Sequence, residues 1–112
     1  MAGTYVSAHV YTKEAIRRCV DAGVHSLEHC NLIDADTAKL AASQGAVAVP
    51  TLVTYDKLVS DGPKLGFPPD SIAKVDVVRS AGMESLAIMR KAGLTMAYGS
   101  DLLGDMHKYQ SE

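Results

Sequence analysis

Three side chains that commonly bind metal ions stand at comparable places in this sequence. His9, His29 and Asp101 each come at or near the end of a short apolar run, within TYVSAHV, VHSLEH and LTMAYGSD. In parallel α/β folds the carboxyl ends of the strands meet at one edge of the sheet, so the three residues are expected to converge. Neutral imidazole and carboxylate are ligands of zinc and similar divalent ions. The pattern therefore predicts a metal site formed by His9, His29 and Asp101.

Such a site would suit hydrolysis. A bound divalent metal lowers the pKa of its water to about 7, which gives hydroxide at neutral pH. A carboxylate beside that water can take its proton and pass it to a leaving group, and Asp101 is the candidate for this general base.

Taken one at a time, these residues also have purely structural explanations. A lone histidine such as His9 is often a hydrogen-bonded core residue. Asp101 follows Gly-Ser and could cap a helix that begins after it. The remaining histidines, His25 at the start of an apolar run and His107 near the end of the sequence, are expected at the surface.

The stretch SLEHCN raises a separate question, because it places a carboxylate next to His29. Side chains alternate along a strand, so Glu28 is expected on the face opposite His29. An ion pair with Arg17 or Arg18, or a hydrogen bond in the helix layer, is its expected structural role. Cys30 has no CxxC spacing around it, so we expect a buried packing thiol there.

Glycines divide the sequence into alternating helices and strands. At Gly23, Gly45 and Gly93 a helical segment ends and a short apolar run begins at once. Glycine just past a helix end readily takes the left-handed conformation found there. Short, continuously apolar strands that alternate with helices indicate a parallel sheet joined by right-handed crossovers. The predicted order is β-α-β-α-β-loop-α-β, an α/β fold.

Capping residues and periodic apolar positions locate the helices. Thr12 is the expected N-cap of the first helix, and Asp34 or Asp36 that of the second. Apolar residues spaced by three and four predict a third helix over about residues 71–92, which Gly82 could bend or break. Residues 52–69 interrupt the rhythm with glycines and prolines; we expect a short helix near 55–59 and otherwise a loop over the active site.

Length and composition limit the chain to one domain and a few kinds of partner. It has 112 residues, 47% of them hydrophobic and 21% charged, with a formal charge of −2. No basic block favours nucleic acid, and no apolar run reaches the roughly 20 residues of a membrane helix. The start lacks the basic region of a signal peptide, and Cys19 and Cys30 are isolated. A cytoplasmic location is therefore expected.

Four parallel strands alone would leave both edge strands unpaired. Open edges and apolar faces favour pairing with another chain, so self-association is expected. The same incompleteness suggests a piece of a larger domain.

Three stretches together resemble the amidohydrolase superfamily of metal-dependent hydrolases. They are SAHVYTKEAIRRCVDAGVHSLEHCNLID, VPTLVTYDKL and YGSDLLGDMHKYQSE, in that order. The sequence is most similar to imidazolonepropionase-type and prolidase-like members, the latter of which hydrolyse dipeptides. The resemblance implies that residues 1–112 are the C-terminal part of a TIM-like (β/α)8 barrel, roughly strands five to eight with their helices.

The resemblance also implies a role for each residue of the site. His9, His29 and Asp101 would bind one or two divalent ions, with zinc the expected metal and Asp101 the general base. Tyr11 would hold the carboxylate of a dipeptide or N-acyl amino acid substrate. The family's His-x-His motif and bridging lysine are not found in this sequence, so the isolated chain is expected to be inactive. The alternative is a catalytically silent α/β fragment that self-associates and at most binds a metal weakly.

Overall fold

Helices and strands alternate along the chain, as the glycine-marked joins predict. A computed structural model describes residues 3–111. Its elements are, in order, β1 (Ser7–Thr12), α1 (Lys13–Asp21), β2 (Ser26–Leu32), α2 (Ala35–Ser43), β3 (Val47–Val49), α3 (Leu52–Asp61), the 3₁₀ helix η1 (Gly62–Leu65), α4 (Pro69–Ala92), β4 (Thr95–Met96) and the 3₁₀ helix η2 (Gly104–Tyr109). None of the helices in this part of the chain is long and apolar enough to cross a membrane.

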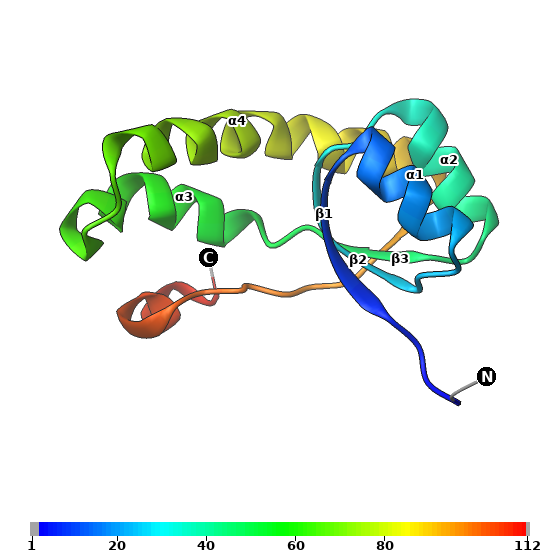
Figure 1. Cartoon of the computed structure of the whole chain (residues 1–112), viewed down its shortest axis with the longest axis horizontal. Helices are drawn as coiled ribbons and strands as arrows, with labels where there is room; N and C mark the ends of the chain where they lie inside the picture. Colours follow the sequence, from blue (N-terminus) through cyan, green and yellow to red (C-terminus); the bar gives the residue numbers. More distant parts are fainter. Residues whose placement is uncertain (1–2, 112) are drawn as a thin grey trace.

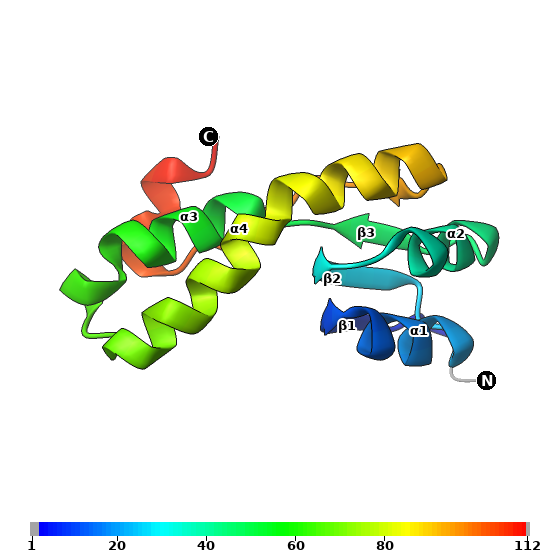
Figure 2. The same cartoon turned by 90° about the horizontal axis from the view of Figure 1, so that it is seen from above.

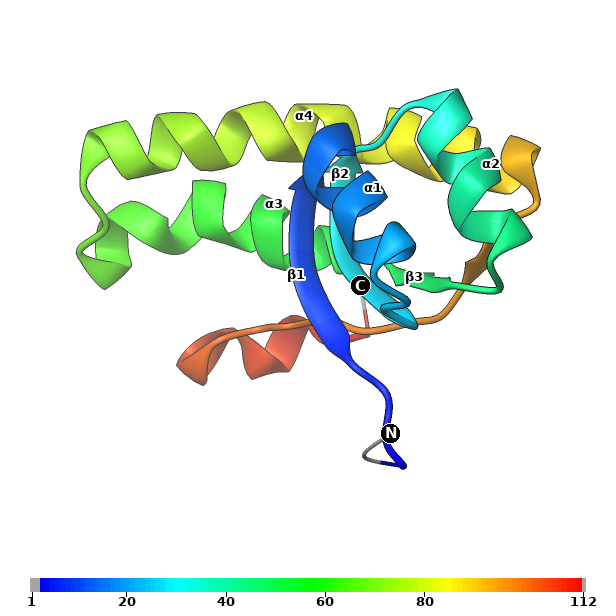
Figure 3. The same cartoon turned by 45° about the vertical axis from the view of Figure 1, so that its right-hand side comes forward.

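The four strands form one parallel sheet in the order β1-β2-β3-β4. The predicted parallel α/β arrangement is confirmed. Each strand pairs with the next one along the chain, and β1 lies at the edge of the sheet (Figure 3). In the register, His9 lies opposite Glu28, and Glu28 lies opposite Val49.

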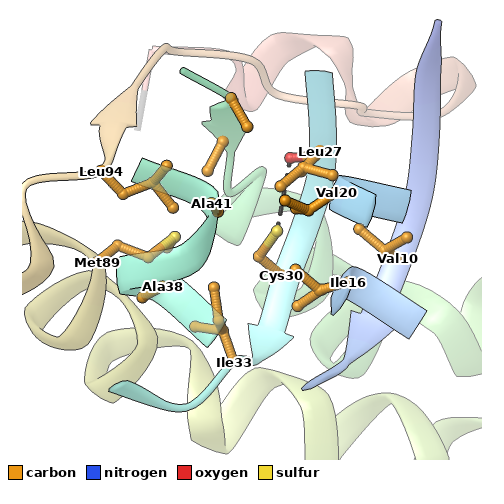
Figure 4. Close-up of a cluster of buried hydrophobic side chains, with 12 residues drawn as sticks. Val10, Ile16, Val20, Leu27, Cys30, Ile33, Ala38, Ala41, Met89 and Leu94 are labelled. Carbon is orange, nitrogen blue, oxygen red and sulfur yellow. Dashed lines mark hydrogen bonds between the residues drawn. The ribbon is translucent and has the colours of Figure 1, made fainter. Parts of the chain in front are cut away.

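One face of the sheet is covered by α1, α2 and the C-terminal part of α4 (Figures 1 and 2). Leu27 of β2 lies at the centre of the core beneath them and is 0% exposed. Figure 4 shows it packed with side chains from the three helices. The buried cluster consists of Val10, Ile16, Val20, Leu27, Cys30, Ile33, Ala38, Ala41, Ala46, Ala48, Met89 and Leu94.

Local capping follows the sequence closely. The Thr12 hydroxyl accepts a hydrogen bond from the Ala15 amide, 3.3 Å away, at the start of α1. Asp34, not Asp36, caps α2 by accepting a 2.9 Å bond from the Thr37 amide. These contacts satisfy amides that have no partner within the helix.

The segment from residue 52 to residue 69 is mostly helical, so the prediction of a loop there was wrong. The short helix expected near 55–59 is the ten-residue α3, and η1 follows it directly. α3 packs against α4, and the two extend together away from the sheet (Figure 1). Gly82 neither breaks nor ends α4. A Cβ at Gly82 would lie 2.7 Å from Leu52 Cδ2, so the glycine permits the close approach of the two helices.

Cys30 is a packing residue, as expected. Its side chain belongs to the buried cluster, and its thiol lies 3.6 Å from the Leu27 carbonyl oxygen (Figure 4). Burial, with smaller contributions from Glu28 and Cys19, raises the pKa of the Cys30 thiol to about 12. A thiol that stays protonated in the core is a poor nucleophile and a poor metal ligand.

Candidate functional site

The structure brings the three predicted metal-binding side chains together. His9 comes from β1 and His29 from β2, while Asp101 follows β4. His9 Nδ1 and His29 Nε2 are 2.7 Å apart, within hydrogen-bond distance. His29 Nε2 lies 4.0 Å from Asp101 Oδ2. The His29 side chain is buried, at 2% exposed, whereas about half of the Asp101 side chain, 49%, faces solvent.

An irregular backbone turns His29 toward this cluster. Leu27 and Cys30 both pack into the helix-covered core, although they are three residues apart and strict alternation would place them on opposite faces. His29 and Cys30 have φ angles of 78° and 55°, and the pairing register with β1 shifts between Val10 and Thr12. The two left-handed residues reset the alternation, so His29 leaves the core side and meets His9.

Glu28 therefore lies on the same side of the sheet as His9, and its predicted place in the helix layer was wrong. It is the register partner of His9, whose neighbours Ala8 and Val10 pack with the core on the other face. Instead of pairing with Arg17 or Arg18, its Oε1 accepts hydrogen bonds from Ser7 at 2.7 Å and Ser26 at 2.6 Å. Both hydroxyls come from the start of the strands, below the histidines.

Aromatic rings enclose His29. Tyr11 stacks on its imidazole at 5.0 Å with an 8° angle between the rings, and His9 stacks at 4.9 Å and 30°. Tyr55 of α3 meets it edge-on at 5.6 Å and 86°. Tyr11 was predicted from the sequence as a substrate-binding residue, whereas Tyr55 was not predicted to belong to the site.

This enclosure favours the neutral imidazole. Burial, followed by the nearby His9, lowers the pKa of His29, and the attraction of Asp101 and Glu28 opposes the shift without reversing it. Neutral imidazole is the form that binds metal ions. Burial is also the main reason that the pKa of Tyr55 lies above its ordinary range, so its phenol stays protonated.

Two threonines at the N-terminal end of α3 make hydrogen-bonding contacts with the cluster. Thr51 Oγ1 lies 2.6 Å from His29 Nδ1, and the Thr54 hydroxyl donates a 2.9 Å bond to the Asp101 carbonyl. In the described part of the chain, four non-glycine residues have positive φ: His29, Cys30, Thr51 and Asp101. Each such conformation costs about 1–3 kcal/mol and persists only where the surroundings enforce it. Their grouping around one cluster makes it the candidate functional site.

The donor chemistry of the cluster suits a divalent transition metal, since it offers two imidazole nitrogens and a carboxylate. His9 Nδ1 and His29 Nε2 are hydrogen-bonded to each other, however, and the Asp101 carboxylate lies 4.0 Å from His29 Nε2. Within residues 3–111, no three or more histidine, cysteine, aspartate or glutamate side chains are arranged to hold a metal ion. The three residues therefore fit part of a metal-ligand set, and a complete set would need further ligands.

The larger cavities lie elsewhere. One of about 470 Å³ between α3 and α4 is lined by Leu52, Val53, Asp56, Arg79 and Met83. It contains none of the residues of the cluster. We place the site at His9, His29 and Asp101 because the titratable groups, the perturbed pKa of His29 and the unusual backbone coincide there.

Comparison with known proteins shows which proteins this chain is similar to. No protein-family model matches the sequence. A solved amidohydrolase structure is 56% identical and matches with a TM-score of 0.94, over 97% of this chain and 26% of that one. A solved prolidase complexed with N-methylphosphonate-L-proline is 55% identical, also with a TM-score of 0.94, over 98% of this chain and 27% of that one. Ochratoxinase of Aspergillus niger is 30% identical over 96 residues, 86% of this chain and 20% of the enzyme.

These similarities cover nearly all of this chain and a limited part of each relative. The chain spans between 20% and 27% of the length of the three proteins. For the two solved structures, sequence identity above one half accompanies a nearly identical backbone within that span. The chain belongs to the amidohydrolase superfamily and corresponds to about a quarter of its solved prolidase and amidohydrolase members.

Proposed function

We propose that this chain forms part of a metal-dependent hydrolase that cleaves amide or peptide bonds in dipeptides or N-acyl amino acids. The observation that carries the proposal is the convergence of His9, His29 and Asp101 from three strands of one sheet. Relatives named as a prolidase and an ochratoxinase support an amide-type substrate. The missing ligands would come from the remainder of a TIM-like barrel, of which this chain would be roughly strands five to eight.

In this proposal His9, His29 and Asp101 hold one or two divalent ions, with zinc the best match to the donors. Such an ion would supply a Lewis acid for the water and for the scissile carbonyl. Asp101 is the general base: its half-exposed carboxylate can take a proton from water and deliver it to the leaving amine. His29 is kept neutral by burial, so it does not compete for that proton.

Tyr11 is the proposed substrate-binding residue. Its ring is fixed by stacking on His29 and by an edge-on contact with Tyr55. About a third of the residue, 37%, remains exposed, so its side chain is accessible from solvent. A tyrosine hydroxyl there can donate a hydrogen bond to a substrate carboxylate.

A second candidate is a silent fragment that self-associates. β1 is an edge strand, and Tyr5, Val6 and Tyr98 are each more than half exposed. Unpaired edges and exposed apolar side chains favour association, and the isolated chain is expected to have little or no hydrolase activity.

A chimera tests the proposed function. The matching quarter of the solved prolidase is replaced by this chain, which the 55% identity and the TM-score of 0.94 permit. We expect the chimera to hydrolyse Xaa-Pro dipeptides in a reaction that chelators abolish. Asp101→Asn in the chimera should lower kcat by about 10²–10⁴-fold, the usual contribution of a general base. Asp105→Asn, which alters an aspartate of η2 outside the cluster, is the control.

Either of two results would overturn the assignment. An active chimera that keeps its kcat after Asp101→Asn would remove Asp101 as the base. A folded chimera without activity toward dipeptides or N-acyl amino acids would favour the silent fragment.

A further inference from the structure

Thr51 occupies the N-cap of α3 without capping it. Threonine at this position normally accepts a hydrogen bond from an amide in the first turn of the helix. Here the side chain makes no capping bond, and its hydroxyl lies 2.6 Å from His29 Nδ1 instead. The backbone of Thr51 is left-handed, with φ 50° and ψ 37°. A β-branched residue in that region is a clear outlier. The contact with His29 is therefore made without a capping bond and with a strained backbone at Thr51.

We propose that Thr51 is a positioning residue that fixes His29 in the tautomer with the proton on Nδ1, so that Nε2 faces His9 and Asp101 as an acceptor. The inference deepens the proposed function, because it assigns the orientation of one of its ligands. The first turn of the same helix also contacts the cluster, since the Thr54 hydroxyl donates a hydrogen bond to the carbonyl of Asp101.

The direction of the hydrogen bonds gives the tautomer. His29 makes one ring contact on each side: Nε2 lies 2.7 Å from His9 Nδ1, and Nδ1 lies 2.6 Å from the Thr51 hydroxyl. A neutral imidazole has one protonated nitrogen, so when Nε2 accepts the proton of His9 Nδ1, Nδ1 of His29 is the donor to Thr51. In this arrangement the lone pair of Nε2 points toward His9 and Asp101, the side on which the proposed ligands gather. A partner on the second ring nitrogen commonly sets the tautomer of a ligating histidine.

Nitrogen-15 spectra of the histidine rings test this in the 112-residue chain without any metal. Spectra are recorded above the ordinary histidine pKa of about 6.5, where protonated and unprotonated nitrogens of neutral rings resonate far apart. We expect the wild type to show Nδ1 of His29 as the protonated nitrogen and Nε2 as the unprotonated one. Thr51→Ser, which keeps the hydroxyl, should give the same pattern.

Thr51→Gly removes the hydroxyl and should move the two His29 resonances toward each other, because both tautomers become populated. Glycine accepts the φ of 50° without strain, so this variant should keep the fold. The exposed rings of His25 and His107 serve as internal references in every spectrum.

Two results would overturn the inference. One is a wild-type His29 that carries its proton on Nε2 or samples both tautomers. The other is a folded Thr51→Gly protein with unchanged His29 resonances. Because no metal is added, a chain that fails to bind metal can still pass this test, and a chain that binds metal can still fail it.

Discussion

Replacing His29 with alanine should weaken the binding of Zn²⁺ to this chain by at least about tenfold, since loss of even an outer-shell partner of a metal typically costs 10–100-fold. His29 contributes the buried, neutral nitrogen that lies between His9 and Asp101. Without it, the two remaining donors are His9, on the edge strand β1, and Asp101, which follows β4 at the other edge of the sheet. No ligand then lies between them. Competition with a metal-sensitive dye measures the two affinities.

His25→Ala is the matched control, because His25 is an exposed histidine outside the cluster. Its affinity for Zn²⁺ should equal that of the wild type, provided that both variants keep the circular dichroism spectrum of the fold. Equal losses in the two variants would show that Zn²⁺ binds to surface histidines without preference.

Leu27→Ala should lower the free energy of unfolding by about 2–5 kcal/mol, the range for removing a large aliphatic side chain from a packed core. Leu27 is 0% exposed and lies between the sheet and its helices, where little can move to fill the space (Figure 4). Small domains are stable by about 5–15 kcal/mol in total, so the loss is a large share. Urea denaturation followed by circular dichroism measures it.

Met83→Ala is the control for this change. Met83 is 72% exposed on α4, so its removal should alter the stability by no more than about 0.5 kcal/mol. A loss for Leu27→Ala as small as that for Met83→Ala would mean that the helices do not pack on β2 as described.

Much of the fold and the centre of the site could be predicted because they depend on local signals. The glycines after the helices, the Thr12 and Asp34 caps and the apolar runs each act within a few residues. The convergence of His9, His29 and Asp101 follows from a property of parallel sheets that holds regardless of the particular side chains.

The full length of α3 and the presence of η1 were missed because glycine and proline are found both in loops and at helix ends. Glycine and proline over residues 62–69 are typical of a loop, but proline is also accepted in the first turn of a helix. Pro63 lies in the first turn of η1 and Pro69 begins α4. The interruption is therefore a short joint between two helices.

The face of Glu28 was misjudged because alternation holds only for regular strands. Two consecutive left-handed residues that are not glycine have no recognisable pattern in the sequence. The roles of Thr54 and Tyr55 were missed for another reason. Thr54 binds the backbone of Asp101, 47 residues later in the chain, and such a partner is set by tertiary packing.

The central claim is that His9, His29 and Asp101 form one metal-binding point, and paramagnetic mapping with Co²⁺ tests it most directly. The untagged chain is titrated with Co²⁺, a spectroscopic substitute for Zn²⁺, while the backbone amide resonances are followed; weak binding is sufficient for this measurement. We expect the earliest broadening at His9, His29 and Asp101 and their neighbours in sequence, with the far ends of α3 and α4 unaffected. Broadening that begins at the Asp56, Asp76 and Arg79 cluster, or that spreads evenly over the surface, would contradict the claim.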